Sequence, residues 1–298
     1  MPLQAKTFLL FISLFAISSV HSQEEDLLKL LGEDKPQKEY VFNAFKSSRV
    51  IMSHSMEMLR PGVLDFRILH RFGNINRGIS EFFGLDQASI RLGLDYGISN
   101  HFTVGIGRGT YKKELDGFLK YRILQQASGP GAMPFSLVAV AGATINTLKF
   151  TDTSRPNFFS SRMAYYGQLI IGRKISEGFT LQLMPTYLHR NLVQFINDPN
   201  DLFAAGIGGR IKLSKRISLN ADYYYVINQN EARTDLHNPL SIGFDIETGG
   251  HVFQLHFTNA IGMNERAFLS ETTNDWAKGD IQFGFNISRA FQIGGKKK

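Results

Sequence analysis

The chain has 298 residues, a formal net charge of +7 from 33 basic and 26 acidic side chains, and no cysteine. The lack of cysteine excludes a disulfide framework, thiol catalysis and thiolate metal sites. The basic residues are scattered, and aromatic residues do not interleave with them in a stacking pattern, so nucleic-acid binding is not expected.

Residues 1–22 have the pattern of a secretory signal peptide. Lys6 precedes an apolar run from Phe8 to Val20, and the residues up to Ser22 are small enough for a signal peptidase. The run is too short for a helix that spans a bilayer. We therefore expect cleavage before Gln23 and a mature protein that works outside the cytoplasm; a retained anchor helix is the alternative.

Residues 23–38 predict a periplasmic helix and linker, with a short amphipathic helix from Asp26 to Leu31 and a charged break after it. From residue 39 to residue 291, apolar and polar residues alternate in segments that recur about every twenty residues, as between Ile90 and Ile98. A period of two residues is the signature of a β-strand. The sequence therefore predicts an all-β domain over residues 39–291.

The strand pattern favours a membrane barrel over a soluble β-sandwich, which is the alternative. No apolar stretch after residue 22 is long enough for a membrane helix, so a membrane-spanning chain would have to form a closed β-barrel that satisfies every backbone group. Aromatic residues such as Tyr96, Tyr187 and Phe257 lie near the segment ends, where the interfacial girdles of membrane barrels occur.

The connections between the segments alternate between short links and long polar loops, which is typical of outer-membrane barrels. The long loops are residues 73–88, 148–160, 191–201, 228–238 and 259–279. Thirteen strands are expected from Val50 onward, and an even count then requires Tyr40–Phe45 as a first strand, which gives an antiparallel barrel of about fourteen strands. A twelve-stranded barrel with the N-terminal pieces packed inside is the alternative.

Three stretches carry a resemblance to a known family. "LDFRILHRFG" (64–73), "HVFQLHFTNAIGMNERAFL" (251–269) and "GDIQFGFNISRAF" (279–291) resemble an uncharacterised family of outer-membrane β-barrel proteins from Bacteroidota, over about residues 45–291. The resemblance implies a barrel fold in the cell outer membrane. The family has no established catalytic residues, so it implies no catalytic site.

The final segment also resembles the C-terminal strand that barrel-insertion machinery reads, which makes that machinery an expected partner together with outer-membrane lipid. Ile281, Phe283, Phe285 and Ile287 form its apolar face, and an aromatic residue closes the run. It differs from an ordinary signal because a basic tail, residues 292–298, follows the aromatic residue.

If the apolar faces point to lipid, charged residues of both signs point into the lumen. Buried ions need water or partners, so the near balance of signs predicts ion pairs and hydrogen bonds across the lumen. These charges either brace the barrel or line a narrow polar passage or solute site. The candidate lumen-lining residues are Asp65, Arg67, Arg91, Asp95, Lys120, Arg122, Arg210, Lys212, Asp222, Asp245 and Glu247.

The loop of residues 259–279 is the second candidate for function, because loops of this length in compact proteins usually have a function or are disordered. It holds Arg266, Phe268 and the only tryptophan, Trp276. We expect it either to fold into or over the barrel mouth, where it would gate access or dock a partner, or to be an ordinary surface loop.

No enzyme motif supports catalysis. No serine lies in a G-x-S-x-G sequence, the strand histidines lack the spacing of a zinc site, and no helix follows the glycine-rich stretch 105–109 to make a phosphate loop. No cofactor or metal is expected. Two functions stay open: a narrow channel or transport and solute-binding barrel of unknown substrate, and a plugged structural or partner-docking barrel without transport, whose partner would be a periplasmic protein.

Overall fold

The computed structural model describes residues 37–151, 153–154 and 156–294. The predicted signal peptide, the predicted helix at Asp26–Leu31 and the last four residues of the basic tail lie outside these residues. Within them, no helix is long and apolar enough to cross a membrane. Residues 40–128 and the described residues from 133 onward form one compact unit, which holds all of the barrel.

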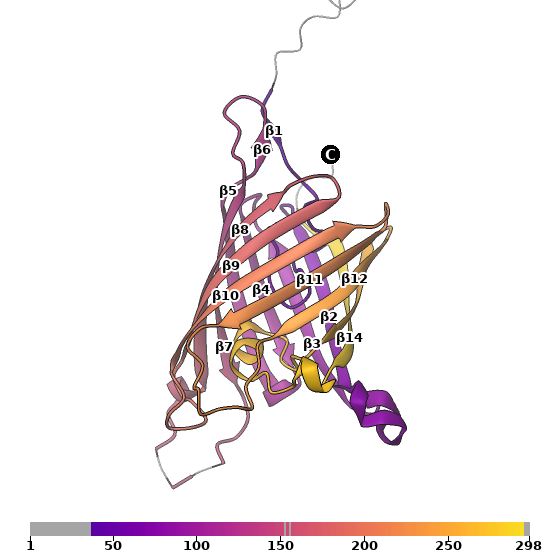
Figure 1. Cartoon of the computed structure of the whole chain (residues 1–298). Coiled ribbons are helices and arrows are strands. Elements are labelled where there is room, and N and C mark those ends of the chain that lie inside the picture. Colours follow the sequence, from indigo (N-terminus) through magenta and orange to yellow (C-terminus); the bar gives the residue numbers. More distant parts are fainter. Residues whose placement is uncertain (1–36, 152, 155, 295–298) are drawn as a thin grey trace, which may run out of the picture. The chain divides into compact units, whose positions relative to one another are not determined.

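Twelve antiparallel strands close into one barrel, in which each strand pairs with its neighbours along the chain and β14 pairs with β2 (Figure 1). The barrel strands are β2 (Val63–Asn74), β3 (Ala88–Gly97), β4 (Phe102–Gly109), β5 (Glu114–Leu124), β7 (Ser136–Asn146), β8 (Met163–Lys174), β9 (Phe179–Arg190), β10 (Asp201–Lys212), β11 (Ile217–Val226), β12 (Leu240–Thr248), β13 (His251–Thr258) and β14 (Gln282–Gln292). The short strands β1 (Glu39–Tyr40) and β6 (Ala127–Ser128) are not part of the barrel sheet. The fold is thus the predicted antiparallel barrel with the alternative count of twelve strands.

The expectation of fourteen barrel strands is wrong, because the two most N-terminal segments do not join the sheet. Residues of Tyr40–Phe45 beyond β1 have no strand conformation, and the segment that starts at Val50 forms a tight turn. In that turn, the N–H of Val50 donates to the carbonyl of Ser53 at 2.9 Å. Since two strands are removed together, the count stays even and both ends of the barrel sheet lie at the same rim.

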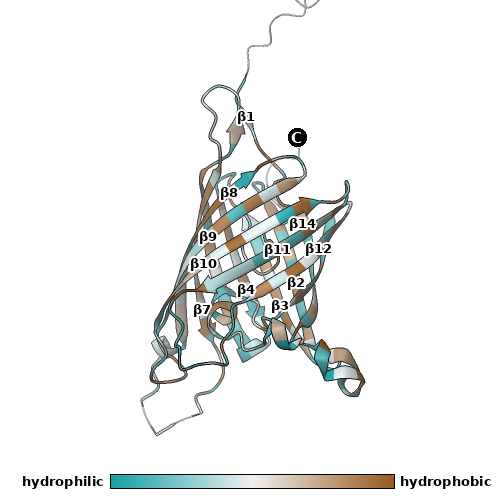
Figure 2. Ribbon diagram, in the orientation of Figure 1, coloured by the Kyte–Doolittle hydropathy of each residue, from teal (hydrophilic) through white to brown (hydrophobic). Residues whose placement is uncertain are grey.

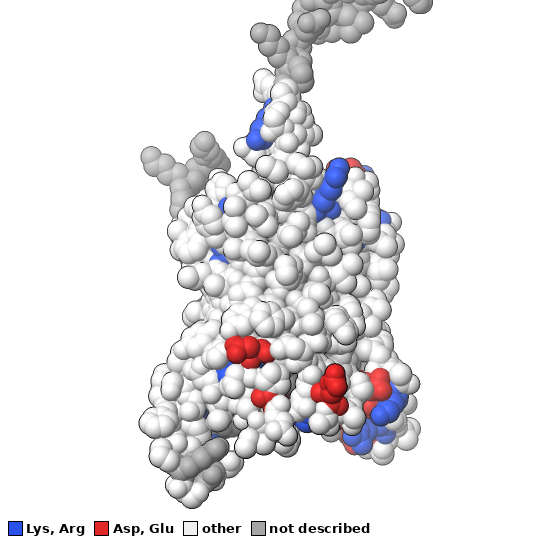
Figure 3. All heavy atoms as spheres, turned by 60° about the vertical axis from the view of Figure 1, so that its left-hand side comes forward, with Lys and Arg blue, Asp and Glu red and all other residues white. Residues whose placement is uncertain are grey.

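The barrel strands have 8 to 12 residues, which is the length needed to cross the hydrocarbon core at a tilt. Along them, burial alternates with exposure, and the exposed positions carry apolar side chains such as Leu94, Ile106, Leu183 and Phe244. Figure 2 shows hydrophobic residues along the strands, and in Figure 3 the charged residues on the visible face gather toward the two ends. The outer surface therefore suits acyl chains.

The connections differ in length at the two rims of the barrel. At the rim that holds both ends of the sheet, β3–β4, β8–β9, β10–β11 and β12–β13 are joined by turns, and only the β5–β7 connection is longer. The opposite rim carries the long loops and their short helices (Figure 1). These helices are η1 (Ile75–Gly84), η2 (Tyr111–Lys113), η3 (Phe159–Arg162), α3 (Glu265–Ser270) and η4 (Trp276–Lys278).

Candidate functional site: the occupied lumen

The interior of the barrel is occupied by the chain's own residues 44–59, which we call the plug. Every plug residue from Ala44 to Met56 except Lys46 is buried, and Val50 and Ser53 are 0% exposed. In Figure 1 the plug is the indigo coil inside the ring of strands. The lumen is therefore filled at this level.

The plug turns sharply, and its serines satisfy the local backbone. The hydroxyl of Ser55 donates to the carbonyl of Ser47 at 2.7 Å, and its N–H donates to the carbonyl of Ser48 at 3.0 Å. Serine side chains commonly offer the backbone such alternatives to sheet pairing. The segment "SSRVIMSHS" therefore has a weaker tendency to form a strand than its apolar centre, Val50–Met52, suggests.

Asp222, an inward-facing residue of β11, is the main clamp on the plug. Its Oδ2 accepts hydrogen bonds from the N–H groups of Met52 and Ser53, at 2.9 and 2.8 Å, and from the Ser53 hydroxyl at 2.8 Å. Buried N–H groups need partners, and a carboxylate that accepts several of them makes strong charge-assisted bonds. The carboxylate thus holds the tip of the plug by binding backbone N–H groups that, in a strand, would bind a neighbouring strand.

Other strands hold the plug backbone around the ring. Gln182 of β9 donates to the carbonyl of His54 at 2.7 Å and accepts from the N–H of Met56 at 3.0 Å. Gln254 of β13 donates to the carbonyl of Val50 at 2.6 Å. Since β9, β11 and β13 all contribute, the plug is anchored to several parts of the wall.

The structure places nine of the eleven candidate lumen-lining residues in buried positions. Those nine are Asp65, Arg67, Arg91, Asp95, Lys120, Arg122, Arg210, Asp222 and Asp245. Of the other two, Lys212 is exposed, and Glu247 is partly exposed and pairs with Lys46 of the plug. Both lie at the rim where the plug enters, because β10 ends at Lys212 and β12 ends one residue after Glu247.

Several of the buried charges bind the plug, where ion pairs across the lumen were expected. The Lys120 ammonium donates to the carbonyl of Glu57 at 2.6 Å, and the Arg210 guanidinium donates to the carbonyl of Ala44 at 3.1 Å. Arg67 also binds the plug, because its Nη1 donates to the Ser47 hydroxyl at 2.8 Å, and it pairs with Asp65 of its own strand at 3.2 Å. The carbonyl groups of the plug backbone accept hydrogen bonds from Lys120 and Arg210, which would otherwise need acidic partners on the opposite wall.

The inward-facing glycines make room for large side chains, so the glycine-rich stretches serve packing. A Cβ on Gly107 would overlap the guanidinium of Arg91, and a Cβ on Gly206 would overlap the ring of Tyr224. Arg91 uses this space to reach Asp116, with Nε 2.8 Å from the carboxylate. Stretch 105–109 is followed by the three-residue 3-10 helix η2 and stretch 206–209 by strand β11, so neither stretch leads into an α-helix as a phosphate loop does.

The loop 259–279 enters the barrel mouth from the long-loop rim. All six residues of α3 are buried, and the helix starts at Asn264, whose side chain accepts from the N–H of Ala267. Phe268 is 0% exposed, and its ring centroid lies 5.3 Å from that of Tyr224 in β11. The first half of the loop therefore closes the lumen at the long-loop rim.

One buried ion pair joins α3 to the plug. The Arg49 guanidinium of the plug lies 2.8 Å from the carboxylate of Glu265, and both side chains are 3% exposed. His54 Nε2 lies 3.4 Å from the same carboxylate oxygen. The plug, which enters from one rim, and the loop, which enters from the other, thus meet inside the barrel.

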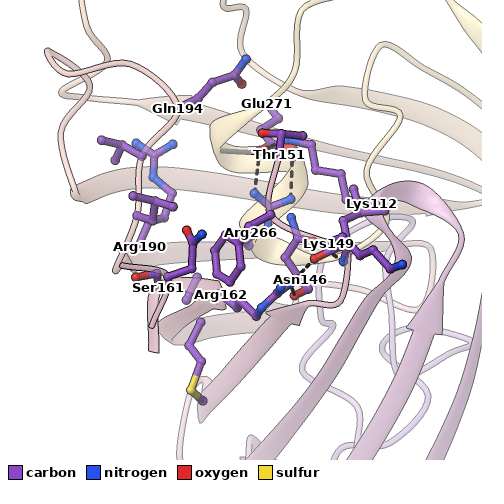
Figure 4. Close-up of a pocket in the computed structure, with 17 residues that line it drawn as sticks. Lys112, Asn146, Lys149, Thr151, Ser161, Arg162, Arg190, Gln194, Arg266 and Glu271 are labelled. Atoms are coloured by element: carbon purple, nitrogen blue, oxygen red, sulfur yellow. Dashed lines mark hydrogen bonds and ion pairs between the residues drawn. The ribbon is translucent and has the colours of Figure 1, made fainter. Parts of the chain in front are cut away.

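The three residues singled out in the loop have different positions. Phe268 and Arg266 lie on α3, where Arg266 pairs with Glu271 in the close-up of Figure 4, while Trp276 in η4 donates to the carbonyl of Leu240 at 3.2 Å. Burial alone would raise the pKa of Glu271, but Arg266 and Lys112 lower it to about 2. The Glu271 carboxylate therefore stays ionised between two cations.

Sequence reasoning did not identify Arg49, His54 or Glu265 as a group, because they are far apart in the chain and no motif links them. The requirement for an even strand count was the only guide to the N-terminal segments. It is met by fourteen strands with these segments in the sheet and by twelve strands with these segments inside the barrel. Among the described residues, no group of three or more histidine and acidic side chains could hold a metal ion.

Comparison with solved structures finds barrels at low identity. The NanC porin matches with a TM-score of 0.49 and 9% identity, over 76% of this chain and 98% of that chain. Omp33 of Acinetobacter baumannii matches with a TM-score of 0.40 and 7% identity, over 76% of this chain and 97% of that chain. The CymD monoaromatic hydrocarbon channel matches with a TM-score of 0.32 and 8% identity, over 78% and 88%.

Among curated sequences, no protein matches. The sequence model of one family does match, over residues 45–291, and its description is a membrane-bound β-barrel domain. The match covers all but the first residue of the plug and all but the last residue of the barrel strands, and it agrees with the closed barrel and its apolar outer face. The chain therefore belongs to the membrane-bound β-barrel domain family DUF5777.

Proposed function

We propose that the protein is an outer-membrane barrel that is closed at rest by its own plug and that docks a periplasmic partner at the rim where the plug enters. The observation that carries this proposal is the burial of Ala44–Met56 in the lumen, with Asp222, Gln182 and Gln254 bound to its backbone. A filled lumen is unsuited to steady passive flow.

The two rims of the barrel give its expected orientation in the outer membrane. In outer-membrane barrels the short turns face the periplasm and the long loops face outward. The chain enters the lumen at the short-turn rim, where the N–H of Val41 donates to the carbonyl of Gln126 at 2.9 Å. A periplasmic protein would therefore reach the rim where the plug enters. Export through a cleaved signal peptide would bring the barrel protein to the same compartment.

Recordings in planar bilayers test the closed state. The chain without its signal peptide should be electrically silent, whereas a variant that also lacks residues 23–59 should give stable conductance steps, because it keeps all twelve strands and loses the plug. A variant that lacks only residues 23–38 is the matched control and should be silent. Equal steps from all three proteins would contradict the proposal.

A gated channel is the second candidate function, and the chemistry of the wall favours it. The inner face carries buried charges of both signs, including Arg67, Lys120, Arg210 and Asp245. With the plug withdrawn, these groups would line a hydrophilic passage. Solute uptake into liposomes that appears only when a periplasmic extract is present would favour this candidate over a purely structural barrel.

A further inference from the structure

A hollow at the long-loop rim is separate from the plugged lumen. It has a volume of about 430 Å³ and lies between the ends of β7, β8 and β9, the loop that follows β7, and the α3 region (Figure 4). Small-molecule sites have volumes of about 300–1,000 Å³. The hollow is therefore large enough for a small organic ligand.

The described lining of this hollow is strongly cationic. Its one carboxylate, Glu271, faces five basic side chains, namely Lys112, Lys149, Arg162, Arg190 and Arg266. Glu271 binds both Lys112 and Arg266, and Arg266 also pairs with Glu114. Among the described residues, no carboxylate lies within ion-pair distance of the other three cations, so the described lining has a net positive charge.

Arg190 is the best-placed of these cations to bind an anion. It is 8% exposed at the end of β9, and its Nε has no hydrogen-bond partner among the described residues. Its Nη2 donates to the carbonyl of Pro199, which orients the guanidinium. A buried donor without a partner is costly, and a guanidinium binds carboxylate and phosphate groups through two parallel bonds.

The remaining wall of the hollow is apolar. Leu148, Phe150, Met163 and Leu192 line it, and the Arg162 guanidinium lies 3.9 Å from the centre of the Phe150 ring. The stacked ring keeps Arg162 at the edge of the hollow, where it also donates to the carbonyl of Asn146 at 3.0 Å. A fully hydrated inorganic ion would leave this apolar wall without a partner.

From this geometry we propose that the hollow binds an organic anion, with its carboxylate or phosphate group on Arg190 and its apolar body against Phe150 and Leu192. The anion is either a free solute outside the cell or the headgroup of an anionic lipid.

Calorimetric titration of the detergent-purified chain without its signal peptide tests the site, with phenyl phosphate as the probe and benzyl alcohol as its uncharged counterpart. Phenyl phosphate should bind, more weakly at higher salt, and benzyl alcohol should not. Arg190→Gln should weaken binding by about tenfold or more, because it removes a charge-assisted contact. Lys215→Gln, in the β10–β11 turn at the opposite rim, is the matched control and should bind like the wild type.

Lys149→Gln provides a second variant in case Arg190→Gln does not fold, because Lys149 is exposed in a loop. It should weaken binding by about threefold through lost charge alone. Absence of phenyl phosphate binding to the wild type, or equal binding by the wild type and both pocket variants, would overturn the proposal.

The same titration in nanodiscs distinguishes the two sources of the anion. If a lipid headgroup occupies the site, anionic phospholipid in the disc should weaken phenyl phosphate binding to the wild type relative to zwitterionic discs. If the ligand is a free solute, the two disc types should give the same affinity. Either result supports the site, and it identifies which anion reaches it.

Discussion

At the scale of single residues, the carboxylate of Asp222 decides whether the plug stays in place. It accepts three short hydrogen bonds from Met52 and Ser53 inside the barrel. Asp222→Ala would leave the buried N–H groups of Ile51, Met52 and Ser53 without an acceptor, at a cost of about 3 kcal/mol in local opening free energy. Hydrogen exchange of residues 50–54 should then accelerate by about 100-fold.

The strands provide the internal standard for this experiment, because their backbone bonds do not involve Asp222. Their exchange should stay unchanged. Asp235→Ala, which removes an exposed loop carboxylate paired with Arg233, is the control and should leave residues 50–54 protected. An unchanged exchange rate at Met52 and Ser53 in Asp222→Ala would show that the clamp is not needed.

Glu271 makes the stability of the folded loop 259–279 depend on pH. Its pKa in the folded protein, about 2, lies below the ordinary value of 4.5, so ionisation stabilises the folded loop. That stability is complete above about pH 4.5 and is lost as the pH falls toward 2, with a total of roughly 3 kcal/mol. Glu271→Gln should remove this part of the pH dependence.

Emission of Trp276 reports on this loop, because it is the only tryptophan and it lies five residues from Glu271. In the wild type, the thermal midpoint of the emission change should fall between pH 4.5 and pH 2 more steeply than in Glu271→Gln. Parallel pH profiles for the two proteins would refute the role of Glu271, since other carboxylates titrate in both.

At the scale of elements, the buried pair between Arg49 and Glu265 couples the plug to α3. Removing one partner of a buried pair leaves an uncompensated charge, which typically costs about 3–5 kcal/mol, whereas removing both costs less. Arg49→Gln and Glu265→Gln should therefore each speed hydrogen exchange in both the plug and α3. The double variant should lie closer to the wild type than the sum of the single effects.

A result confined to one element would contradict this coupling. If Glu265→Gln loosened only α3 and left residues 47–55 protected, the two segments would be neighbours without energetic linkage. Ser80→Ala, in the exposed η1 region, is a control that should change neither element.

The sequence predicted the elements well where period-two alternation coincides with a lipid-facing stripe, as in β3 and β14. It could not separate a strand from the plug near Val50, because the short apolar run "VIM" suits both and its partners lie more than 100 residues away, at Asp222 and Gln182. The alternation also indicated inward positions for charges such as Lys120. It could not show that these charges bind the plug backbone.

At the scale of the whole molecule, the barrel is a closed sheet whose interior is filled from both rims. The plug enters at the short-turn rim, α3 enters at the long-loop rim, and they meet at Arg49 and Glu265. Several buried polar groups on the inner wall, among them Asp222, Gln182 and Lys120, find partners in the plug. Whether the barrel can conduct then depends on whether the plug or α3 can move out of the lumen. The alternation pattern of the strands does not predict such a movement.

The most direct test of this account is thiol labelling at two adjacent plug positions, which is clean because the chain has no cysteine of its own. In a barrel strand one of two adjacent residues would face the aqueous lumen, whereas Val50 and Ile51 are 0% and 1% exposed inside the barrel. Val50→Cys and Ile51→Cys should therefore both resist a water-soluble maleimide in intact membranes and react after denaturation. Ile196→Cys, which replaces a loop residue that is 96% exposed, should react at once. Labelling of either plug position as fast as position 196 would contradict the plugged barrel.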